Sequence, residues 1–388
     1  MIYLDNNATT QIHPEVLTAM QPWLGEKYGN PSSTHRLGQE SRQAVEQARY
    51  EVAAMLGCHI SEVIFTSGGT EADNAAILGT LAARPGKKTI ITSTVEHSAV
   101  REPLMALANT GYTIIEIPVD GRGQLNIAAL EEHLPNPDVA LLTIMWANNE
   151  TGVMLDIQAI GTLAAKHHVP FHTDAVQAAG KIPVAFASLP VDLLSVSAHK
   201  FHGPKGIGAL LVKRRTPWQP LLRGGPQERE RRGGTENVPA IVGMGAAARC
   251  AAANLASPEY THHIAMLRDR LENGILSRVP DTAVNGDPLH LVANTTNISF
   301  TGLEAQAVLM LLSQHDICVS AGAACSSGSL EPSHVLRAMH LAEPRAHGAV
   351  RFSLSAFTTA AEVDRVIDMI PEFISRLRNV LPAGNSQP

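Results

Sequence analysis

The stretch SVSAHKFHGPKGIGALLV, residues 195–212, contains the features on which the interpretation of this 388-residue chain turns. An apolar segment typical of a buried strand ends near Ser197, a turn rich in glycine and proline follows, and a second apolar segment begins at Gly208. Lys200 comes directly after the first strand, at a sheet edge, where open α/β folds bind their ligands. A lysine in that position is more often a solvated surface residue, so its role depends on what accompanies it.

Outward from this stretch, short β-rich segments alternate with helical patterns through the first two thirds of the chain. The segments are residues 63–66, 89–93, 113–119, 139–147, 169–174, 193–198 and 208–213. Apolar residues recur at helical spacing between them, for example over 41–56 and 157–167. The alternation predicts an α/β domain with a mostly parallel sheet. From about Ser257 longer helices surround a few strands, such as 294–300 and 349–355, which predicts a second, smaller α+β domain.

The composition is that of an ordinary soluble globular protein. Hydrophobic residues make up 45% of the chain and charged residues 17%, and the net charge is -6. The charge predicts neither nucleic acid nor a membrane as partner, although Arg229 to Arg232 form a local basic patch. The N-terminus lacks the pattern of a signal peptide, and no apolar run reaches membrane-spanning length. Four cysteines without CxxC spacing argue against disulfides and a zinc site, and favour a reducing cytoplasm.

Asp174 is the first residue that gives Lys200 a partner. It ends the strand segment of FHTDAVQAAGK, 26 residues before Lys200, so two neighbouring strands would direct an acid and an amine into one cleft. Pyridoxal phosphate needs this pair, because a carboxylate keeps the pyridine nitrogen protonated while a lysine holds the aldehyde. The alternative is that Asp174 only caps a helix beginning at Ala175.

A glycine-rich turn supplies a third feature. In FTSGGTEADN, residues 65–74, a strand runs into a turn and then into a helix from about Thr70. The N–H groups of such a helix start, with the Thr70 hydroxyl, suit a phosphate. The motif matches neither a Walker loop nor GxGxxG, so it does not indicate nucleotide binding, and Ser/Thr-Gly turns before helices are also common caps.

Histidines and one cysteine complete the candidate residues. His97 follows the strand 89–93 and could stack on a cofactor ring while exchanging a proton, or it could be structural. His199 and His202 flank Lys200 without the carboxylates or thiols of a metal site. Cys325 lies among alanine, glycine and serine, a composition typical of a mobile loop that exposes its thiol, whereas most free cysteines are buried.

Ten motifs along nearly the whole chain resemble the NifS/IscS group of cysteine desulfurases. They lie at residues 3–10, 28–35, 65–74, 95–100, 146–152, 172–181, 197–208, 231–237, 325–339 and 350–355. The motifs WANNETG and RRGGTEN resemble the nitrogen-fixation NifS branch more closely than the housekeeping IscS branch. The resemblance implies the fold-type I, class V aminotransferase architecture, with a seven-stranded sheet. It places a large pyridoxal phosphate domain at 14–256 and a small domain at 1–13 and 257–388, in a homodimer.

The resemblance also implies roles for individual residues. Lys200 would join pyridoxal phosphate covalently, Asp174 would bind its ring nitrogen and His97 would stack on the ring. Gln177 and Asn149 would contact the ring oxygen or the substrate. The residues expected to hold the phosphate are Gly69, Thr70, Ser197, His199 and, from the other subunit, Thr235. Arg351 would clamp the substrate carboxylate with two hydrogen bonds, a geometry that lysine cannot provide.

The implied activity converts L-cysteine to L-alanine and leaves the sulfur as a persulfide on Cys325. An iron-sulfur scaffold protein is the expected acceptor, with nitrogenase maturation as one destination, and Cys325 could touch a transient [2Fe-2S] cluster. A selenocysteine lyase or an aminotransferase on the same fold is an alternative, as is a non-catalytic scaffold. Two departures stand out: Ala321 and Ala323 replace loop serines of the family, and Asp316 stands where glycine is common.

Overall fold

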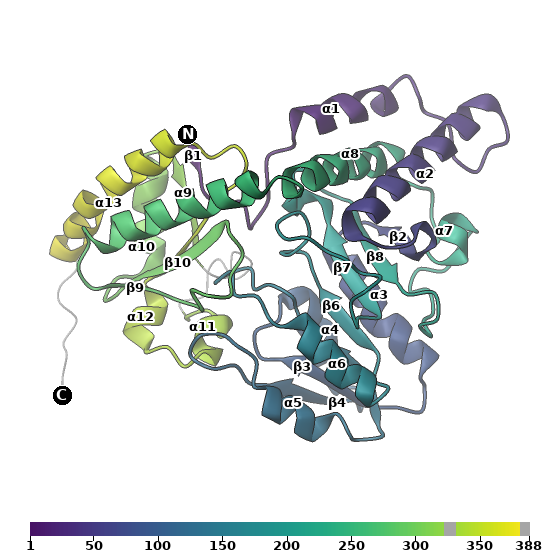
Figure 1. Cartoon of the computed structure of the whole chain (residues 1–388), viewed down its shortest axis with the longest axis horizontal. Coiled ribbons are helices and arrows are strands. Elements are labelled where there is room, and N and C mark those ends of the chain that lie inside the picture. Colours follow the sequence, from purple (N-terminus) through teal and green to yellow (C-terminus); the bar gives the residue numbers. More distant parts are fainter. Residues whose placement is uncertain (322–330, 381–388) are drawn as a thin grey trace.

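A seven-stranded sheet forms the centre of the larger lobe in the computed structural model, which describes residues 1–321 and 331–380 (Figure 1). Its strands, in spatial order, are β2 (Val63–Thr66), β8 (Gly208–Val212), β7 (Leu193–Ser197), β6 (Phe171–Asp174), β5 (Val139–Thr143), β3 (Thr89–Ser93) and β4 (Thr113–Ile117). Only β8 runs antiparallel to its neighbours. The predicted mostly parallel sheet is therefore confirmed.

Helices cover both faces of this sheet. Alternate strand residues point to opposite sides, so Phe65 joins the core under α2 and α8 while Ile64 joins the core under α3. The helices of this lobe are α1 (Pro14–Met20), α2 (Arg36–Leu56), α3 (Gly69–Ala83), α4 (Ser98–Ala108), α5 (Ile127–His133), α6 (Ile157–Lys166), α7 (Gln227–Glu230) and α8 (Val238–Leu255). Burial on both faces explains why the strands read as continuous apolar runs rather than alternating ones.

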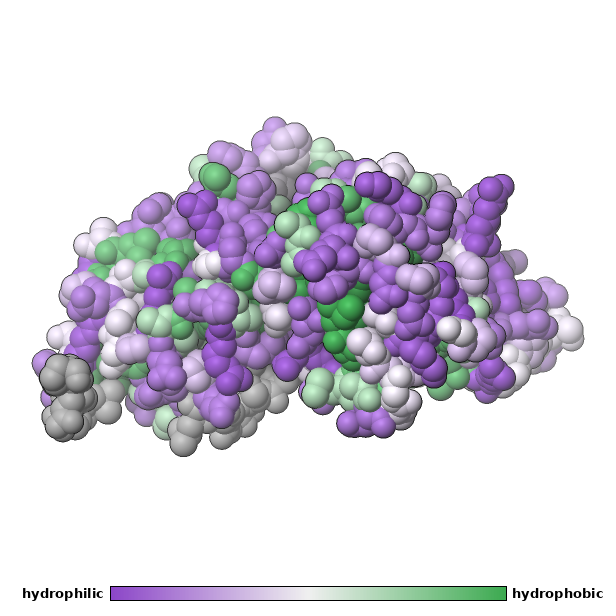
Figure 2. Space-filling view, turned by 90° about the horizontal axis from the view of Figure 1, so that it is seen from below, coloured by the Kyte–Doolittle hydropathy of each residue, from purple (hydrophilic) through white to green (hydrophobic). Residues whose placement is uncertain are grey.

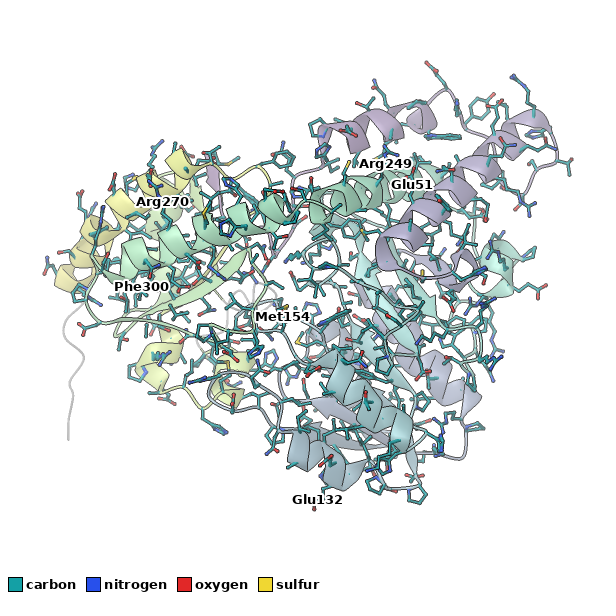
Figure 3. All side chains as sticks on the ribbon, viewed as in Figure 1. Glu51, Glu132, Met154, Arg249, Arg270 and Phe300 are labelled. Atoms are coloured by element: carbon teal, nitrogen blue, oxygen red, sulfur yellow. The ribbon has the colours of Figure 1, made fainter. Side chains whose placement is uncertain are left out.

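The smaller lobe is built on a four-stranded antiparallel sheet with its own core. The sheet orders β12 (Ser320–Ala321), β13 (Ala349–Ser353), β10 (Thr295–Phe300) and β9 (Thr282–Val284). Its helices are α9 (Pro258–Leu276), α10 (Ala305–Gln314), α11 (His334–Ala338), α12 (Glu343–His347) and α13 (Ala360–Val380). Phe300 lies in this lobe (Figure 3), where it is fully buried with Leu271 and Phe352.

The N-terminal strand belongs to the smaller lobe rather than to the larger one that follows it in sequence. β1 (Ile2–Tyr3) pairs in parallel with β11 (Ile317–Cys318). The chain then leaves this lobe, builds the large sheet and returns through α9 (Figure 1). Residues 5–10 thus run across the space between the two lobes, which places them beside the ends of the large sheet.

α8 is apolar because it is a core helix. By length and composition it could cross a membrane, yet 56% of it is buried inside the fold, where it packs on α1 and α2. A Cβ at Gly245 would lie 2.6 Å from the Cα of Ala48, so the axes of α8 and α2 approach closely. Arg249 and Glu51 join the same two helices at the surface, 2.8 Å apart (Figure 3). The molecular face in Figure 2 is largely hydrophilic, with small hydrophobic patches.

Two local expectations need correction. The helix from Ala175, considered as the alternative explanation of Asp174, does not form; the chain makes turns there, and a carboxylate oxygen of Asp174 accepts the N–H of Val176 at 2.9 Å. The apolar run at 238–255 does reach membrane-spanning length. The glycine preference at position 316 also has a reason, because Asp316 adopts φ 59°, which aspartate tolerates better than most residues.

Candidate active site

Five strand ends meet at one edge of the large sheet. β3, β5, β6 and β7 are mutually parallel, and β2 runs the same way because both β2 and β7 are antiparallel to β8. The segments that follow these carboxyl ends carry the residues singled out from the sequence. They are Gly69 and Thr70 after β2, His97 after β3, Asn149 after β5, Asp174 and Gln177 at and after β6, and Ser197, His199 and Lys200 at and after β7.

These side chains line a single cavity of about 480 Å³. The predicted residues that border it are Gly69, Thr70, His97, Asn149, Asp174, Gln177, Ser197, His199, Lys200 and Arg351. Thr235 is not among the described residues that line it, and Cys325 lies outside the described part of the chain. The edge of the sheet therefore gathers an amine, a buried acid, a histidine and a helix start around a space large enough for a small cofactor.

Lys200 is held at the cavity wall by the N-terminal segment. It ends a short 3-10 turn, Ala198–Lys200, directly after β7. Its Nζ donates to the carbonyl oxygens of Asn7 at 2.6 Å and Ala8 at 2.8 Å. These hydrogen bonds aim the amine into the space between the lobes.

Asp174 belongs to a set of buried carboxyl groups. Its pKa is raised by burial, although His97, the N–H of Val176 and Lys200 counteract this effect. Burial likewise raises the pKa of Asp73 well above its usual value, with the charge of Asp174 adding to the shift, and raises that of Glu96 to about 8. A cationic N–H in the cavity would restore the charged form of Asp174.

His97 faces the cavity with a defined tautomer. Its Nδ1 accepts the N–H of Ala99 at 3.1 Å and so caps α4. Burial lowers the pKa of His97, and the positive charge of Lys200 lowers it further, while Asp174 raises it. A neutral ring whose Nδ1 is an acceptor carries its proton on Nε2. In this tautomer His97 can donate a hydrogen bond or a proton at Nε2 but cannot accept one there.

The start of α3 has the features of an anion site. No side chain caps it, and its first N–H groups lie at the cavity. A Cβ at Gly69 would come within 2.9 Å of Val176 Cγ2 and 3.5 Å of Ser197 Cβ, so glycine leaves the backbone accessible. His199, whose pKa burial lowers to about 4, lies close by as a neutral ring and hydrogen-bonds Thr9 Oγ1 through Nδ1 at 3.2 Å.

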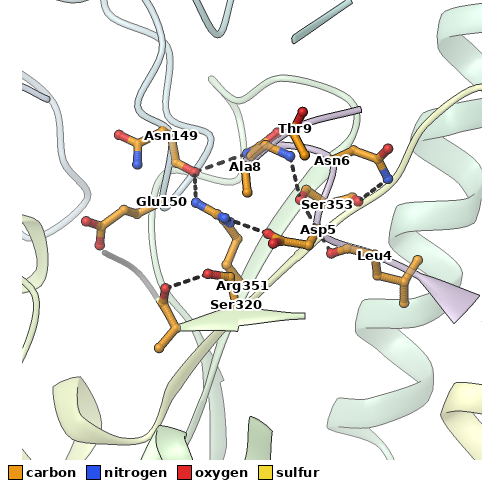
Figure 4. A network of polar contacts seen from close by, with 12 residues as sticks. Leu4, Asp5, Asn6, Ala8, Thr9, Asn149, Glu150, Ser320, Arg351 and Ser353 are labelled. Atoms are coloured by element: carbon orange, nitrogen blue, oxygen red, sulfur yellow. Dashed lines mark hydrogen bonds and ion pairs between the residues drawn. The ribbon is translucent and has the colours of Figure 1, made fainter. Parts of the chain in front are cut away.

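Arg351 reaches the cavity from β13 of the smaller lobe. Its guanidinium donates to Asp5 Oδ1 at 2.7 Å and to the carbonyl oxygen of Asn149 at 2.9 Å (Figure 4). Its Nε is buried without a hydrogen-bond partner among the described residues. The arginine is therefore positioned by both lobes and retains donor capacity for an anion.

The loop that carries Thr235 is firmly attached to the large lobe. Glu228 forms a buried bidentate ion pair with Arg49, both hydrogen bonds measuring 2.7 Å. Arg232 binds Glu71, in the first turn of α3, at 2.9 and 3.0 Å. Thr235 follows with its side chain exposed. Thr235 is therefore accessible at the surface and is not among the described residues that line the cavity of its own chain.

Sequence reasoning missed several residues that the fold brings to the site. Asn7 and Ala8 accept from Lys200, and Lys181 donates to Asn7 Oδ1 at 2.7 Å. Asp73, on α3, lines the cavity, but its place in the sequence predicts only an ordinary residue of a helix. Lys181 and Asn7 lie inside the family motifs at residues 172–181 and 3–10. Their place in these motifs was the sequence signal that could have identified them. Their contacts depend on lobe packing, which no local pattern encodes.

One further group of possible metal ligands lies away from the cavity. Among the described residues, His13, Glu15 and Cys250 offer ligand atoms within 4.8 Å of one another. His13 Nδ1 already accepts the N–H of Glu15 at 3.2 Å, as the cap of α1. Glu15 also raises the pKa of the Cys250 thiol, though less than burial does. These contacts give the three residues a structural role.

The residues at the sheet edge fit pyridoxal phosphate. Asp174 is a buried acid that a ring N–H would pair, the uncapped start of α3 suits a phosphate, and Lys200 is an amine between them. Arg351 adds a buried donor for a substrate carboxylate. Each chemical part of the cofactor thus has a matching group on this chain.

Comparisons with known proteins agree with this chemistry. Residues 2–366 match the class-V aminotransferase family. The chain is 50% identical to a cysteine desulfurase of Cereibacter sphaeroides, covering 99% of this chain and 98% of that protein. It is 48% identical to the cysteine desulfurase NifS of Azotobacter vinelandii, over 99% and 96% of the two chains. A solved NifS-like protein superposes with a TM-score of 0.90 at 37% identity, covering 97% of this chain and 100% of that one.

Proposed function

The chain belongs to the class-V aminotransferase family and is a cysteine desulfurase, and from this premise we propose that it binds pyridoxal phosphate at Lys200 and transfers sulfur from L-cysteine to Cys325. The observation that carries the proposal is the convergence of Lys200, Asp174 and the uncapped start of α3 on one cavity. The names of the relatives favour this activity over an aminotransferase, a selenocysteine lyase or a non-catalytic scaffold.

The cofactor residues have separable tasks. Gly69, Thr70, Ser197 and His199 would hold the phosphate, and Asp174 would pair with the ring nitrogen. When bound, pyridoxal phosphate supplies an electron sink for the charge that develops at the substrate Cα. His97 would stack on the ring, and its Nε2 proton makes it a donor at neutral pH.

The substrate carboxylate would bind Arg351. The Asp5 carboxylate that now contacts this guanidinium keeps the arginine oriented, and Asn149 holds it from the other lobe. A planar guanidinium can bind a carboxylate through two parallel hydrogen bonds. The Lys200 amine, once the substrate has replaced it on the cofactor, would take the Cα proton and return it to the product.

The sulfur-transfer step would occur at Cys325, which lies outside the described residues. The Cys325 thiolate attacks the sulfur of the substrate, a new S–S bond forms and the C–S bond breaks. The electron pair of the broken bond remains with the carbon skeleton, which takes up protons to become L-alanine. The balance is one L-cysteine and one enzyme thiol giving one L-alanine and one enzyme persulfide.

We further propose that two chains complete each site. The exposed Thr235 lies on a loop fixed by the Arg49–Glu228 and Arg232–Glu71 pairs, so it is presented to a neighbour in a defined position. In a homodimer it would reach the phosphate bound to the partner. This arrangement would make the dimer a requirement for full cofactor affinity.

The persulfide sulfur would pass to an iron-sulfur scaffold protein in the cytoplasm. Cys58, Cys250 and Cys318 are free thiols, which suits a reducing compartment. The similarity to NifS of Azotobacter vinelandii supports nitrogenase maturation as one destination of the sulfur. A transient [2Fe-2S] contact at Cys325 would mark the hand-over. One hydrophobic core cluster is made only of residues from 1–13 and 257–388, which supports a small domain of these residues beside a large domain, 14–256.

The proposal is tested by incubating the purified protein with L-cysteine and measuring alanine and protein-bound persulfide. Lys200→Ala should abolish both products, and Cys325→Ala should abolish the persulfide and reduce alanine at least a hundredfold, a size typical for loss of an essential catalytic group. The matched controls are Lys205→Ala, an exposed lysine of the same loop, and Cys250→Ala. Unchanged alanine release by Cys325→Ala would refute the persulfide route.

A further inference from the structure

Lys181 is a second lysine beside the site that the proposed chemistry does not use. It follows β6 by seven residues and its Nζ reaches back toward Lys200. The Nζ donates to Asn7 Oδ1 at 2.7 Å and to Gln177 Oε1 at 2.5 Å. Burial lowers its pKa well below the usual value, and the charges of Lys200 and Arg351 lower it further. Keeping such an amine enclosed is costly, so its contacts invite a functional explanation.

Asn7 connects Lys181 to the amine that would hold the cofactor. The carbonyl oxygen of Asn7 accepts from Lys200 Nζ at 2.6 Å and from Gln177 Nε2 at 2.9 Å. Its side-chain oxygen accepts from Lys181 and, at 3.2 Å, from Asn294. One asparagine therefore fixes both lysines and the glutamine relative to one another.

These contacts determine which way the Gln177 amide points. The amine of Lys181 donates a hydrogen bond in either protonation state, and the group of Gln177 that accepts it is the side-chain oxygen. The carbonyl oxygen of Asn7 is only an acceptor, so the group that faces it must be the amide nitrogen. The second N–H of that nitrogen remains available, and Gln177 lines the cavity.

We propose that Lys181 is a positioning residue, which fixes the Gln177 amide so that its nitrogen donates to the ring oxygen of the cofactor. The proposal rests on the proposed function, since it needs pyridoxal phosphate bound at Lys200. It assigns a role to Lys181 through Gln177 and requires no contact between Lys181 and the cofactor itself.

The proposal predicts a spectroscopic effect. A hydrogen bond to the ring oxygen draws negative charge away from the neighbouring nitrogen that joins Lys200 to the cofactor, which lowers the pKa of that nitrogen. Other groups act on Lys200 as well: Asp174 and His97 share charge interactions with it, as do His199 and Lys181. Comparing the titrations of the variants separates the effect of the Gln177 hydrogen bond from the effects of these charges.

The experiment is an absorption titration of the loaded enzyme without substrate, over pH 6 to 10. Lys181→Met should raise the pKa of the linkage by roughly one unit, the usual size of an effect from one nearby hydrogen bond or charge. Lys181→Arg, which keeps the donor, should titrate within about a third of a unit of the wild type. An unchanged titration of Lys181→Met would overturn the proposal.

A double-mutant cycle separates positioning from charge alone. In a Gln177→Leu background Lys181→Met should have little further effect, because the group it orients is gone. An equal shift in both backgrounds would mean that Lys181 acts only through its charge, and would overturn the proposal. If Lys181→Met does not fold, Lys181→Leu, which also lacks a hydrogen-bond donor, replaces it with the same expectations. Failure of the wild type itself to bind the cofactor would instead refute the proposed function.

Discussion

Buried carboxyl groups beside the cavity bear on how the protein responds to pH. Asp73, Asp174 and Glu150 line the cavity, and the buried Glu96 interacts with the charges of the two aspartates. Glu96 Oε1 accepts from Ser93 Oγ at 2.5 Å and from the N–H of Met145 at 2.9 Å, while Oε2 has no partner within the described residues. A carboxyl group with one unsatisfied buried oxygen favours its protonated form.

The pKa of Glu96 predicts how stability depends on pH. It is about 8 in the folded chain and 4.5 as the ordinary value, so the folded state binds more protons between these limits. The contribution of Glu96 to the free energy of unfolding is fully present below pH 4.5 and is lost as the pH rises to 8. The loss is up to about 1.4 kcal/mol for each pH unit. Between pH 5.5 and 7.5 the cofactor-free wild type should lose about 2 kcal/mol more unfolding free energy than Glu96→Gln.

Denaturant unfolding of the two proteins at both pH values measures this difference. The exposed Glu116→Gln provides the control and should keep the wild-type dependence. Parallel curves for the wild type and Glu96→Gln would contradict a raised pKa at this position.

Lys200 and Asp174 could be predicted at the residue scale, whereas Asn7 and Lys181 could not. Asp174 ends β6 and Lys200 follows the end of the neighbouring strand β7, so local patterns place them at one edge. Asn7 meets Lys200 across 193 positions of sequence, through contacts between lobes. The glycine preference at Asp316 became clear only from its positive φ.

At the scale of elements, the start of α3 is the part of the site most sensitive to added bulk. Gly69→Ala places a Cβ against Val176 Cγ2 and forces the turn to shift. The N–H groups would then lose their alignment with a phosphate. The dissociation constant for pyridoxal phosphate should rise about tenfold or more, equivalent to about 1.4 kcal/mol.

Equilibrium titration of the apoprotein with pyridoxal phosphate, followed by absorption, checks this expectation. Gly86→Ala is the matched control, because a Cβ at Gly86 meets nothing within 4 Å. Equal affinities for the two variants would show that the start of α3 does not hold the phosphate.

The α2–α8 contact is an element-scale determinant of stability. Gly245→Ala would put a methyl group 2.6 Å from Ala48 Cα and push the helices apart. Overpacking of this kind should lower the free energy of unfolding by about 1–3 kcal/mol. Thermal or denaturant unfolding measures the loss, with the exposed Gly25→Ala expected to match the wild type. A stability equal to that of the wild type would mean that the helices separate without cost.

At the scale of the whole molecule, the placement of Thr235 predicts complementation between defective chains. Lys200→Ala lacks the amine, and Thr235→Ala lacks the group offered to the partner. In a mixed dimer, the site with an intact Lys200 would receive Thr235 from the other chain. Activity at limiting pyridoxal phosphate should therefore exceed that of either variant alone. Mixing, re-equilibration and assay of alanine release test this; activities that merely average would place Thr235 in its own site or in none.

The architecture as a whole could largely be predicted from the sequence. The strand segments, and the change near Ser257 to longer helices around a few strands, correspond to observed elements. The contact between residues 5–10 and the sheet edge could not be predicted, because it depends on how two separately formed cores meet. The helix considered as an alternative at Ala175 illustrates the same limit: the chain makes a turn there, and a carboxylate oxygen of the site residue Asp174 accepts the N–H of Val176.

The pairing of β1 with β11 has a consequence for biosynthesis. Ile2 leaves the ribosome before its partner Ile317, which follows 315 residues later. At roughly 5–20 residues per second, the first strand waits about 15–60 s for that partner. During this interval the segment that carries Asn7 and Ala8 lacks the strand pairing that anchors it beside Lys200. Arg351 also reaches the cavity from β13, so the pocket around Lys200 is complete only in chains that have been translated beyond residue 351.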